Sequence, residues 1–195
     1  MEKYGQGLAN TRRLGDAERF CPNYSSLSLP QRKEFWVHMM AAIALPESTD
    51  TLISRPFDER RKQNVSARTT MDGYGFEHYS VGLFALSYNY GTEPLYQPFC
   101  GGISRSADRG KGVLDPSLTL NSVKVQTDCA VGIMNRYVTH HGSIGYDGNA
   151  FRGPAWSTVM HGNPATRALT IPEVRQSFPP CFAGSGSAPA RKGRR

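Results

Sequence analysis

The stretch SLPQRKEFWVHMMAAIALPES, residues 28–48, carries the signals of a long amphipathic helix. Ser28 and Gln31 have the spacing of a capping box. Pro30 falls in the first turn, where a backbone N–H would have no helical partner in any case. Apolar side chains then recur at three- and four-residue intervals and predict one buried stripe over about 29–45. That stripe consists of Phe35, Trp36, Met39, Met40 and Ile43. A mainly α fold built around this helix is expected.

Glu47 falls four residues beyond Ile43, one helical repeat after the end of the stripe. Its side chain points toward the core, or toward a cleft beside it, if the helix persists for another turn. Pro46 opposes this, because a proline deletes the bond to the Ala42 carbonyl and tends to kink or end a helix, at a cost of about 3 kcal/mol. Glu47 therefore lies either in water just past the helix end or in a partly dry site.

A carboxyl group in a dry site takes up a proton, finds a cation or is retained for its chemistry. Desolvation raises the pKa of a glutamic acid, so that it holds a proton near neutral pH and can deliver it to a leaving oxygen. Cleavage of a glycosidic bond needs that step, usually with a second carboxylate across the bond. The candidates for this second group are Asp50, Asp58, Asp72 and Asp115, and position singles out none of them.

Length and composition predict one loop-rich domain. The chain has 195 residues, of which 38% are hydrophobic, and its 20 glycines and 13 prolines imply long connections. Residues 1–20 are polar and aperiodic, which predicts a flexible arm. The segment 177–195 is rich in Pro, Gly, Ser and Ala and ends in RKGRR, which predicts a flexible basic tail. The domain is expected over 21–176.

The net charge of +7 favours a polyanionic partner, such as nucleic acid, anionic lipid or a bacterial wall polymer. Binding to nucleic acid would rest on charge alone, because the chain lacks a recognisable motif or a basic helix interleaved with aromatic residues. No membrane span is expected, since no stretch approaches roughly 18 consecutive apolar residues. Residues 1–20 also lack the apolar core of a signal peptide. The protein then stays inside the cell, leaves by another route or lacks its true start.

Three further segments have a predicted structure. The apolar and aromatic run YSVGLFALSYNY (79–90) fits either a short buried helix or a strand. A helix is predicted over 117–139, with Asp115 or Ser117 as its cap and Gly142 as its terminator. The segment FRGPAWSTVM (151–160) is expected to begin a last helix anchored by Trp156.

The cysteines number four and include no CxxC pair, so no zinc site is expected. They can form two disulfides in an oxidising compartment or remain buried thiols in a reducing one. Three pairings are open, and one of them joins Cys100 to Cys129 and Cys21 to Cys181. The neighbours His140 and His141 point in different directions on a helix, which argues against a metal site there as well.

Three motifs follow one another along the chain: ALPES (44–48), YSVGLFALS (79–87) and DPSLTLNSVKVQTDCAVGIMNRYV (115–138). Their order and spacing resemble the soluble lytic transglycosylase family of the lysozyme-like superfamily. That family has Glu-Ser at a helix end, then G-L-[ML]-Q-[IL]-S, then D-P-x-x-N-[LI] before a long helix. The resemblance covers about 21–160. It implies a mainly α, α+β lysozyme-like single domain, with a sugar cleft between a helical lobe and the loops around 72–112.

The resemblance also implies roles in cutting peptidoglycan, the murein of the cell wall. Glu47 would protonate the oxygen between N-acetylmuramic acid and N-acetylglucosamine and then take the proton of the muramyl 6-hydroxyl, which closes a 1,6-anhydro ring. The substrate acetamido group would stabilise the cationic centre, so neither a second carboxylate nor a cofactor is required. Ser48 would hold the glutamate or the acetamide by a hydrogen bond.

The remaining expected substrate contacts lie in and after the glycine motif. Gly82 and Leu83 would form a tight wall of the sugar cleft, because glycine lets backbone and ring approach closely, and Ser87 of the same motif would also bind substrate. Tyr88 and Tyr90 are further candidates, either as platforms on which sugars stack or as ordinary core or surface aromatics.

The chain departs from the family pattern. Ala85 replaces the glutamine of the glycine motif, Pro46 replaces a helix-compatible residue, and no A-Y-N motif follows the long helix, where neither Tyr137 nor Tyr146 inherits the family's late tyrosine. A lysozyme-type hydrolase and a non-catalytic peptidoglycan-binding relative are therefore kept as alternatives. In each case the protein would act in the cell envelope or periplasm, or after secretion, and the sequence identifies no export or immunity partner.

Overall fold

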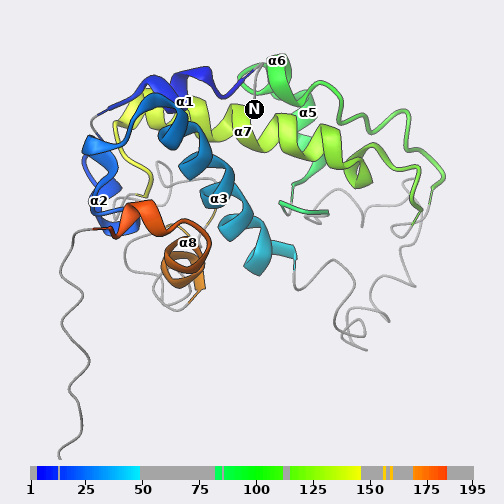
Figure 1. Ribbon diagram of the computed structural model, residues 1–195. Coiled ribbons are helices and arrows are strands. Elements are labelled where there is room, and N and C mark those ends of the chain that lie inside the picture. Colours follow the sequence, from blue (N-terminus) through cyan, green and yellow to red (C-terminus); the bar gives the residue numbers. More distant parts are fainter. Residues whose placement is uncertain are drawn as a thin grey trace, which may run out of the picture.

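The structure, a computed structural model, describes residues 4–12, 14–48, 82–84, 86–111, 115–145, 156, 159 and 169–183. This part of the chain is mainly α, as predicted (Figure 1). Its helices are α1 (Gln6–Asn10), α2 (Ala17–Phe20), α3 (Leu29–Ser48), α5 (Tyr88–Thr92), α6 (Gln97–Cys100), α7 (Val123–His141) and α8 (Ile171–Ser177). Short 3-10 turns occur at Tyr24–Ser26, Thr119–Asn121 and Pro179–Cys181. Among the described residues, no helix combines the length and apolar character needed to cross a bilayer.

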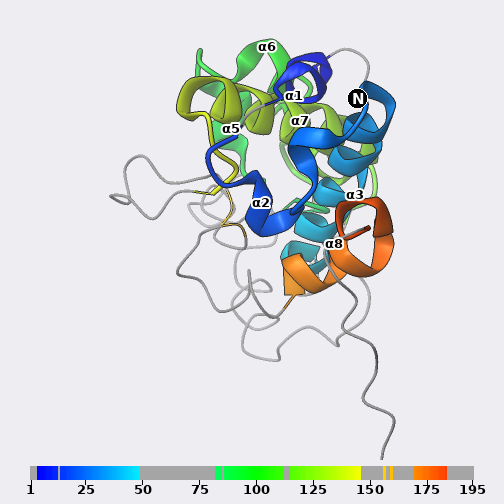
Figure 2. The same ribbon diagram turned by 60° about the vertical axis from the view of Figure 1, so that its left-hand side comes forward.

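The long helices α3 and α7 form the frame (Figures 1 and 2). Helices α1, α6 and α8 pack against them, whereas α2 packs on α8 and α5 packs on α6. The predicted stripe of α3 is confirmed, because all of its members are buried. Trp36 lies at the centre of this packing: its indole N–H donates to the Leu8 carbonyl at 3.0 Å and to the Tyr24 hydroxyl at 3.1 Å. The core therefore joins α3 directly to the N-terminal segment.

Both ends of α3 follow from local chemistry. The predicted capping box is present, since the Ser28 N–H donates to Gln31 Oε1 at 2.9 Å and the Gln31 N–H donates back to Ser28 Oγ at 3.4 Å. At the other end the helix continues through Pro46 and stops at Ser48. The proline leaves the Ala42 carbonyl without its helical donor, and the described helix nevertheless includes Glu47 and Ser48.

The prediction of a flexible arm over 1–20 is wrong for most of this stretch. Leu8 on α1 and Phe20 on α2 are fully buried. The buried Arg32 of α3 donates its Nε–H to the Ala9 carbonyl at 2.7 Å, which fixes α1 against α3. The apolar residues of this segment are too sparse to show a period, and it is their contacts with distant helices that order them.

The helix predicted over 117–139 begins later and ends as expected. It starts at Val123, with Ser122 as the cap whose hydroxyl accepts the Val125 N–H. The predicted caps were wrong: Asp115 Oδ1 instead accepts the Ser117 N–H at 2.8 Å within the preceding turn. Gly142 terminates the helix in the left-handed conformation, with φ of 66°.

The four cysteines form two disulfides, Cys21–Cys181 and Cys100–Cys129. The first joins the end of α2 to the turn after α8, and the second joins α6 to α7. Phe178 and Cys181 are buried, so the packed part of the chain extends past 176 and the predicted tail begins too early.

Candidate functional site

Glu47 lies in the last turn of α3 and is partly buried. The helix continues beyond Pro46, which is the condition under which Glu47 was expected to lie in a partly dry site. The C-terminal end of α3 lies beside the segment that begins at Gly82, and both views of the ribbon agree on this (Figures 1 and 2). Burial raises the pKa of the Tyr90 hydroxyl on α5, and the negative charges of Glu93 and Glu47 raise it further. Among these charges Glu47 has the smallest effect on Tyr90.

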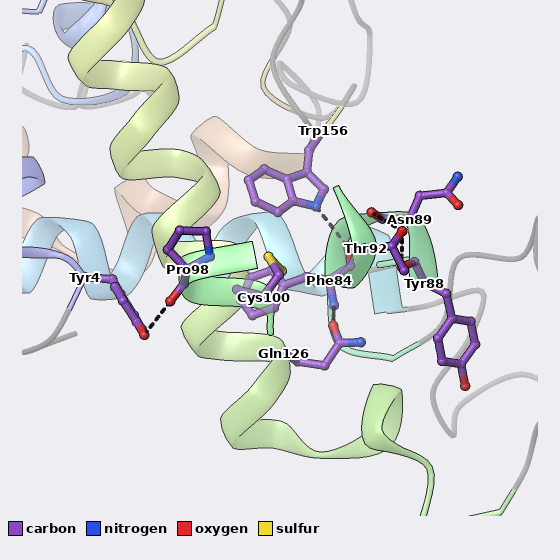
Figure 3. The surroundings of a disulfide bond; sticks show 10 residues. Tyr4, Phe84, Tyr88, Asn89, Thr92, Pro98, Cys100, Gln126 and Trp156 are labelled. Carbon is purple, nitrogen blue, oxygen red and sulfur yellow. Dashed lines mark hydrogen bonds between the residues drawn. A yellow bond between two sulfur atoms is a disulfide. The ribbon is translucent and has the colours of Figure 1, made fainter. Parts of the chain in front are cut away.

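The turn Gly82–Phe84 is held by two side chains from elsewhere in the chain (Figure 3). Gln126 on α7 accepts the Phe84 N–H at 3.0 Å through Oε1, and its Nε2 donates to the Leu120 carbonyl at 2.7 Å. Trp156 donates its indole N–H to the Phe84 carbonyl at 2.9 Å. Both backbone groups of Phe84 are thus paired inside the protein. Trp156 is buried and holds this turn, whereas the helix that it was expected to anchor lies largely outside the described residues.

Gly82 is required at its position for a reason that the sequence did not give. Its φ is +81°, and a Cβ there would lie 2.4 Å from Gln126 Nε2 and 2.7 Å from the Leu120 carbonyl oxygen. The close approach that demands glycine is therefore to α7 and the turn before it. Leu83 and Ser87, the other expected contacts from this motif, are half-buried. Their roles toward a sugar stay predictions.

Gln126 was missed by the sequence reasoning, although a signal existed. It is a polar residue on the apolar face of the predicted helix, and it is only 1% exposed. Buried polar side chains are normally paired, so a glutamine there implies a specific backbone partner. That partner is the turn beside Glu47.

Replacing Gln126 with methionine is expected to destabilise the protein by about 3 kcal/mol, because two buried backbone groups lose their partners at about 1–3 kcal/mol each. Methionine keeps the volume and the flexibility of the side chain. Urea unfolding measures the effect. The control is Gln176→Met on the exposed face of α8, which should change the free energy of unfolding by less than about 0.5 kcal/mol. Equal values for the two variants would show that Gln126 does not hold the turn.

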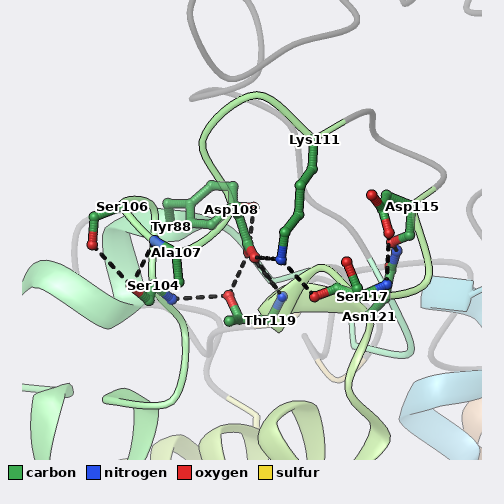
Figure 4. A network of polar contacts seen from close by, with 10 residues as sticks. All are labelled: Tyr88, Ser104, Ser106, Ala107, Asp108, Lys111, Asp115, Ser117, Thr119 and Asn121. Atoms are coloured by element: carbon green, nitrogen blue, oxygen red, sulfur yellow. Dashed lines mark hydrogen bonds and ion pairs between the residues drawn. The ribbon is translucent and has the colours of Figure 1, made fainter.

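Tyr88 was one of the aromatic residues considered for stacking on a sugar, and for this residue that role is wrong. Its side chain is 2% exposed, and its hydroxyl donates to Asp108 Oδ2 at 2.8 Å (Figure 4). Burial raises the pKa of Tyr88 far above its usual value, and the hydrogen bond to Asp108 adds to this. The alternative of a core aromatic is the correct one.

Asp108 is a fully buried carboxylate at the centre of a polar network. The Thr119 N–H donates to both of its oxygens, at 2.9 and 2.8 Å, and Lys111 Nζ lies 3.2 Å from Oδ1 (Figure 4). Burial alone would raise the pKa of Asp108, but the hydrogen bonds from Thr119, Tyr88 and Lys111 hold it below its ordinary value of 3.8. The network ties α5 to the loop before α7.

Asp108 is expected to make stability depend on acid pH. Because its folded pKa is lowered, the ionised group stabilises the fold above about pH 3.8, and this contribution is lost as the pH falls through the folded pKa. Asp108→Asn should lower the free energy of unfolding by about 2 kcal/mol at pH 7 and flatten its fall below pH 4. Urea unfolding from pH 7 to pH 2 tests this against Asp128→Asn on α7, a half-exposed carboxylate whose ion-pair partner is the exposed Lys124. If the free energy of unfolding of Asp108→Asn fell below pH 4 as steeply as that of the wild type, Asp108 would not be the source of this pH dependence.

Some expected site residues lie outside the part that the structure describes. These are Asp50, Asp58, Asp72, Ala85 and Tyr146, together with the side chain of Ser48. Among the candidates for a second carboxylate, Asp115 is described. The hydrogen bonds from Ser117 lower the pKa of Asp115, so its environment favours the ionised form.

No protein-family model and no curated protein matches this chain. Two solved structures are similar to it, and both are glutamate-to-glutamine mutants of DslA (Bd0314). One has a TM-score of 0.57 and 23% identity, covering 92% of this chain and 85% of its own. The other has a TM-score of 0.55 and 21% identity, covering 93% of this chain and 83% of its own. The chain therefore shares its fold with DslA over most of both lengths.

Proposed function

We propose that this protein is a peptidoglycan lytic transglycosylase with Glu47 as its single catalytic residue. The observation that carries the proposal is the position of Glu47, which lies partly buried on the last turn of α3, beside the Gly82 segment and within electrostatic reach of Tyr90. These are the stretches whose motifs resemble the soluble lytic transglycosylase family. They are far apart in the sequence and close in the fold.

In the proposed reaction Glu47 begins protonated. It gives its proton to the oxygen that links N-acetylmuramic acid to N-acetylglucosamine, and the bond from the muramyl C1 to that oxygen breaks. The acetamido oxygen stabilises the positive C1. The Glu47 carboxylate then takes the proton of the 6-hydroxyl, whose oxygen bonds to C1 and closes the 1,6-anhydro ring. The glutamic acid is regenerated and no water is consumed.

Two further facts support this assignment. Both similar structures carry a glutamate-to-glutamine change, which preserves side-chain size and removes the acidic proton, as one would design for a glutamate suspected of acid–base chemistry. The net charge of +7 also suits an anionic wall polymer. We place the site of action in the cell envelope or periplasm, or outside the cell after secretion, because the proposed substrate is there.

A lysozyme-type hydrolase would use the same glutamate and leave reducing ends. Mass spectrometry of fragments released from purified sacculi separates the two, since an anhydromuramyl end lacks one water relative to a reducing end. Anhydro products support the transglycosylase, and reducing products support the hydrolase.

A non-catalytic peptidoglycan-binding protein is the second candidate, and Ala85 in place of the family glutamine favours it. It predicts that the protein pellets with sacculi and releases no soluble fragments. Release of either product class would exclude this candidate.

A further inference from the structure

A surface pocket of about 290 Å³ lies between the N-terminal segment, α6 and α7. Its lining residues are Tyr4, Gln6, Gly7, Phe99, Gly132, Asn135 and Arg136. This volume is just below the range of about 300–1,000 Å³ for small-molecule sites, which suits a group of about one sugar ring. Both ribbon views place α1 and α6 together against α7 (Figures 1 and 2).

The walls of this pocket depend on close approaches that only glycine allows. A Cβ on Gly7 would lie 2.3 Å from Asn135 Oδ1, and a Cβ on Gly132 would lie 2.2 Å from Cγ of the Phe99 ring. Tyr4 is also fixed, because its hydroxyl donates to the Pro98 carbonyl at 2.9 Å (Figure 3). Its ring packs edge to face on Phe99 with the centroids 6.0 Å apart. The aromatic side of the pocket is therefore preformed.

The polar side of the pocket has unused hydrogen-bonding capacity. Asn135 Oδ1 is buried and has no hydrogen-bond partner in the described part of the protein. An unpaired buried oxygen is uncommon, and this one lies against Gly7 at the wall of the pocket. Arg136 is exposed, and no described carboxylate forms an ion pair with it. The side chains of Asn135 and Arg136 thus lie together at one small site.

A row of partly buried aromatic rings leads from the pocket toward Glu47. Phe99 contacts Tyr96 with a centroid distance of 6.1 Å, and Tyr96 contacts Tyr90 at 5.3 Å. Tyr90 is the residue whose pKa is raised in part by the Glu47 charge. Phe99, Tyr96 and Tyr90 therefore form a continuous row of partly buried aromatic rings that begins at the pocket.

We propose that the pocket binds one acidic sugar unit of a glycan strand, with the sugar ring against Tyr4 and Phe99 and the carboxylate toward Arg136. The C–H faces of a pyranose pack on aromatic rings, its hydroxyl groups bond to amides such as Asn135, and a guanidinium binds a carboxylate through two parallel hydrogen bonds. The choice of a wall glycan rests on the proposed function. The strand would pass along the aromatic row to reach Glu47.

Binding of monosaccharides tests the pocket without any cleavage. N-acetylmuramic acid and N-acetylglucosamine share a ring and an acetamide, and only the former carries a lactyl carboxylate. In NMR titrations of the full chain, the backbone amide signals of Gly7 and Gly132 should shift with both sugars, and N-acetylmuramic acid should bind about tenfold more tightly. Unshifted signals at both glycines, or equal affinities, would overturn the proposal.

Two arginine variants complete the test. Arg136→Gln should remove the tenfold preference for the acidic sugar, whereas Arg19→Gln, which deletes the same charge from an exposed position of α2, should retain it. The same preference for the acidic sugar in both variants would also overturn the proposed sugar site. Because the titration does not depend on Glu47 chemistry, sugar binding without sacculus cleavage would refute only the proposed function. Cleavage of sacculi without any shift of the Gly7 and Gly132 amide signals would refute only this sugar site.

Discussion

Glu47→Gln is expected to lower the rate at which the protein releases soluble fragments from sacculi by about 10²–10⁴-fold, the usual contribution of a general acid–base group. Glutamine has nearly the size of glutamic acid and remains able to form hydrogen bonds, but it can neither give nor take the proton. In the proposed reaction the same group acts in both steps, so the loss should fall in the upper part of this range.

The matched control is Glu34→Gln, which removes an equal charge from an exposed position of the same helix. It should cleave at the wild-type rate. Release of labelled fragments from sacculi measures the rates, and thermal unfolding by circular dichroism checks that both variants are folded. Full cleavage by Glu47→Gln would refute the transglycosylase and the hydrolase together.

Removal of the Cys21–Cys181 disulfide is expected to have the largest effect on stability. The bond joins residues separated by 160 positions, and closing a loop of that length restricts the unfolded chain by up to about 5 kcal/mol in the chain-entropy model. The junction has other contacts as well, since the Asn23 N–H donates to the Cys181 carbonyl at 3.1 Å. We expect Cys21→Ser with Cys181→Ser to lower the free energy of unfolding by about 4 kcal/mol.

The second disulfide provides the comparison. Cys100–Cys129 spans 29 positions, so the double serine variant of that pair should lose about 1.5 kcal/mol less in the same model. Denaturant unfolding of the two variants and the wild type under oxidising conditions measures both losses. A larger loss from the shorter loop would contradict the entropic explanation.

Features set by neighbouring residues could be predicted from the sequence. The start of α3 follows from the capping box at Ser28, its buried stripe follows from spacing, and the end of α7 follows from Gly142. Each depends on residues within about one helical turn, where the chemistry of caps and periodicity is strong. The position of Glu47 was predictable only as two alternatives, because the cost of Pro46 and the gain from packing oppose each other.

Features set by distant contacts could not be predicted. Leu8 and Phe20 are ordered by packing with helices that follow much later in the chain, and no local period marks them. Tyr88 and Tyr90 belong to the same apolar and aromatic run, so the sequence does not distinguish them. In the structure a hydrogen bond to Asp108 holds Tyr88 in the core, whereas Tyr90 is partly accessible. The demand for glycine at 82 likewise comes from Gln126, which lies on another helix.

The hydrogen bond from Trp156 to the Phe84 carbonyl has a practical consequence. The chain contains two tryptophans. The other, Trp36, is a residue of α3 and is buried against α1. Trp156 fluorescence should therefore respond to changes in the turn next to Glu47, while Trp36 emission reports on the helical interior. With Trp36 replaced by phenylalanine, the protein would carry a single tryptophan, next to its candidate site, which can be excited selectively over the tyrosines, and ligand binding could be followed optically without an added label.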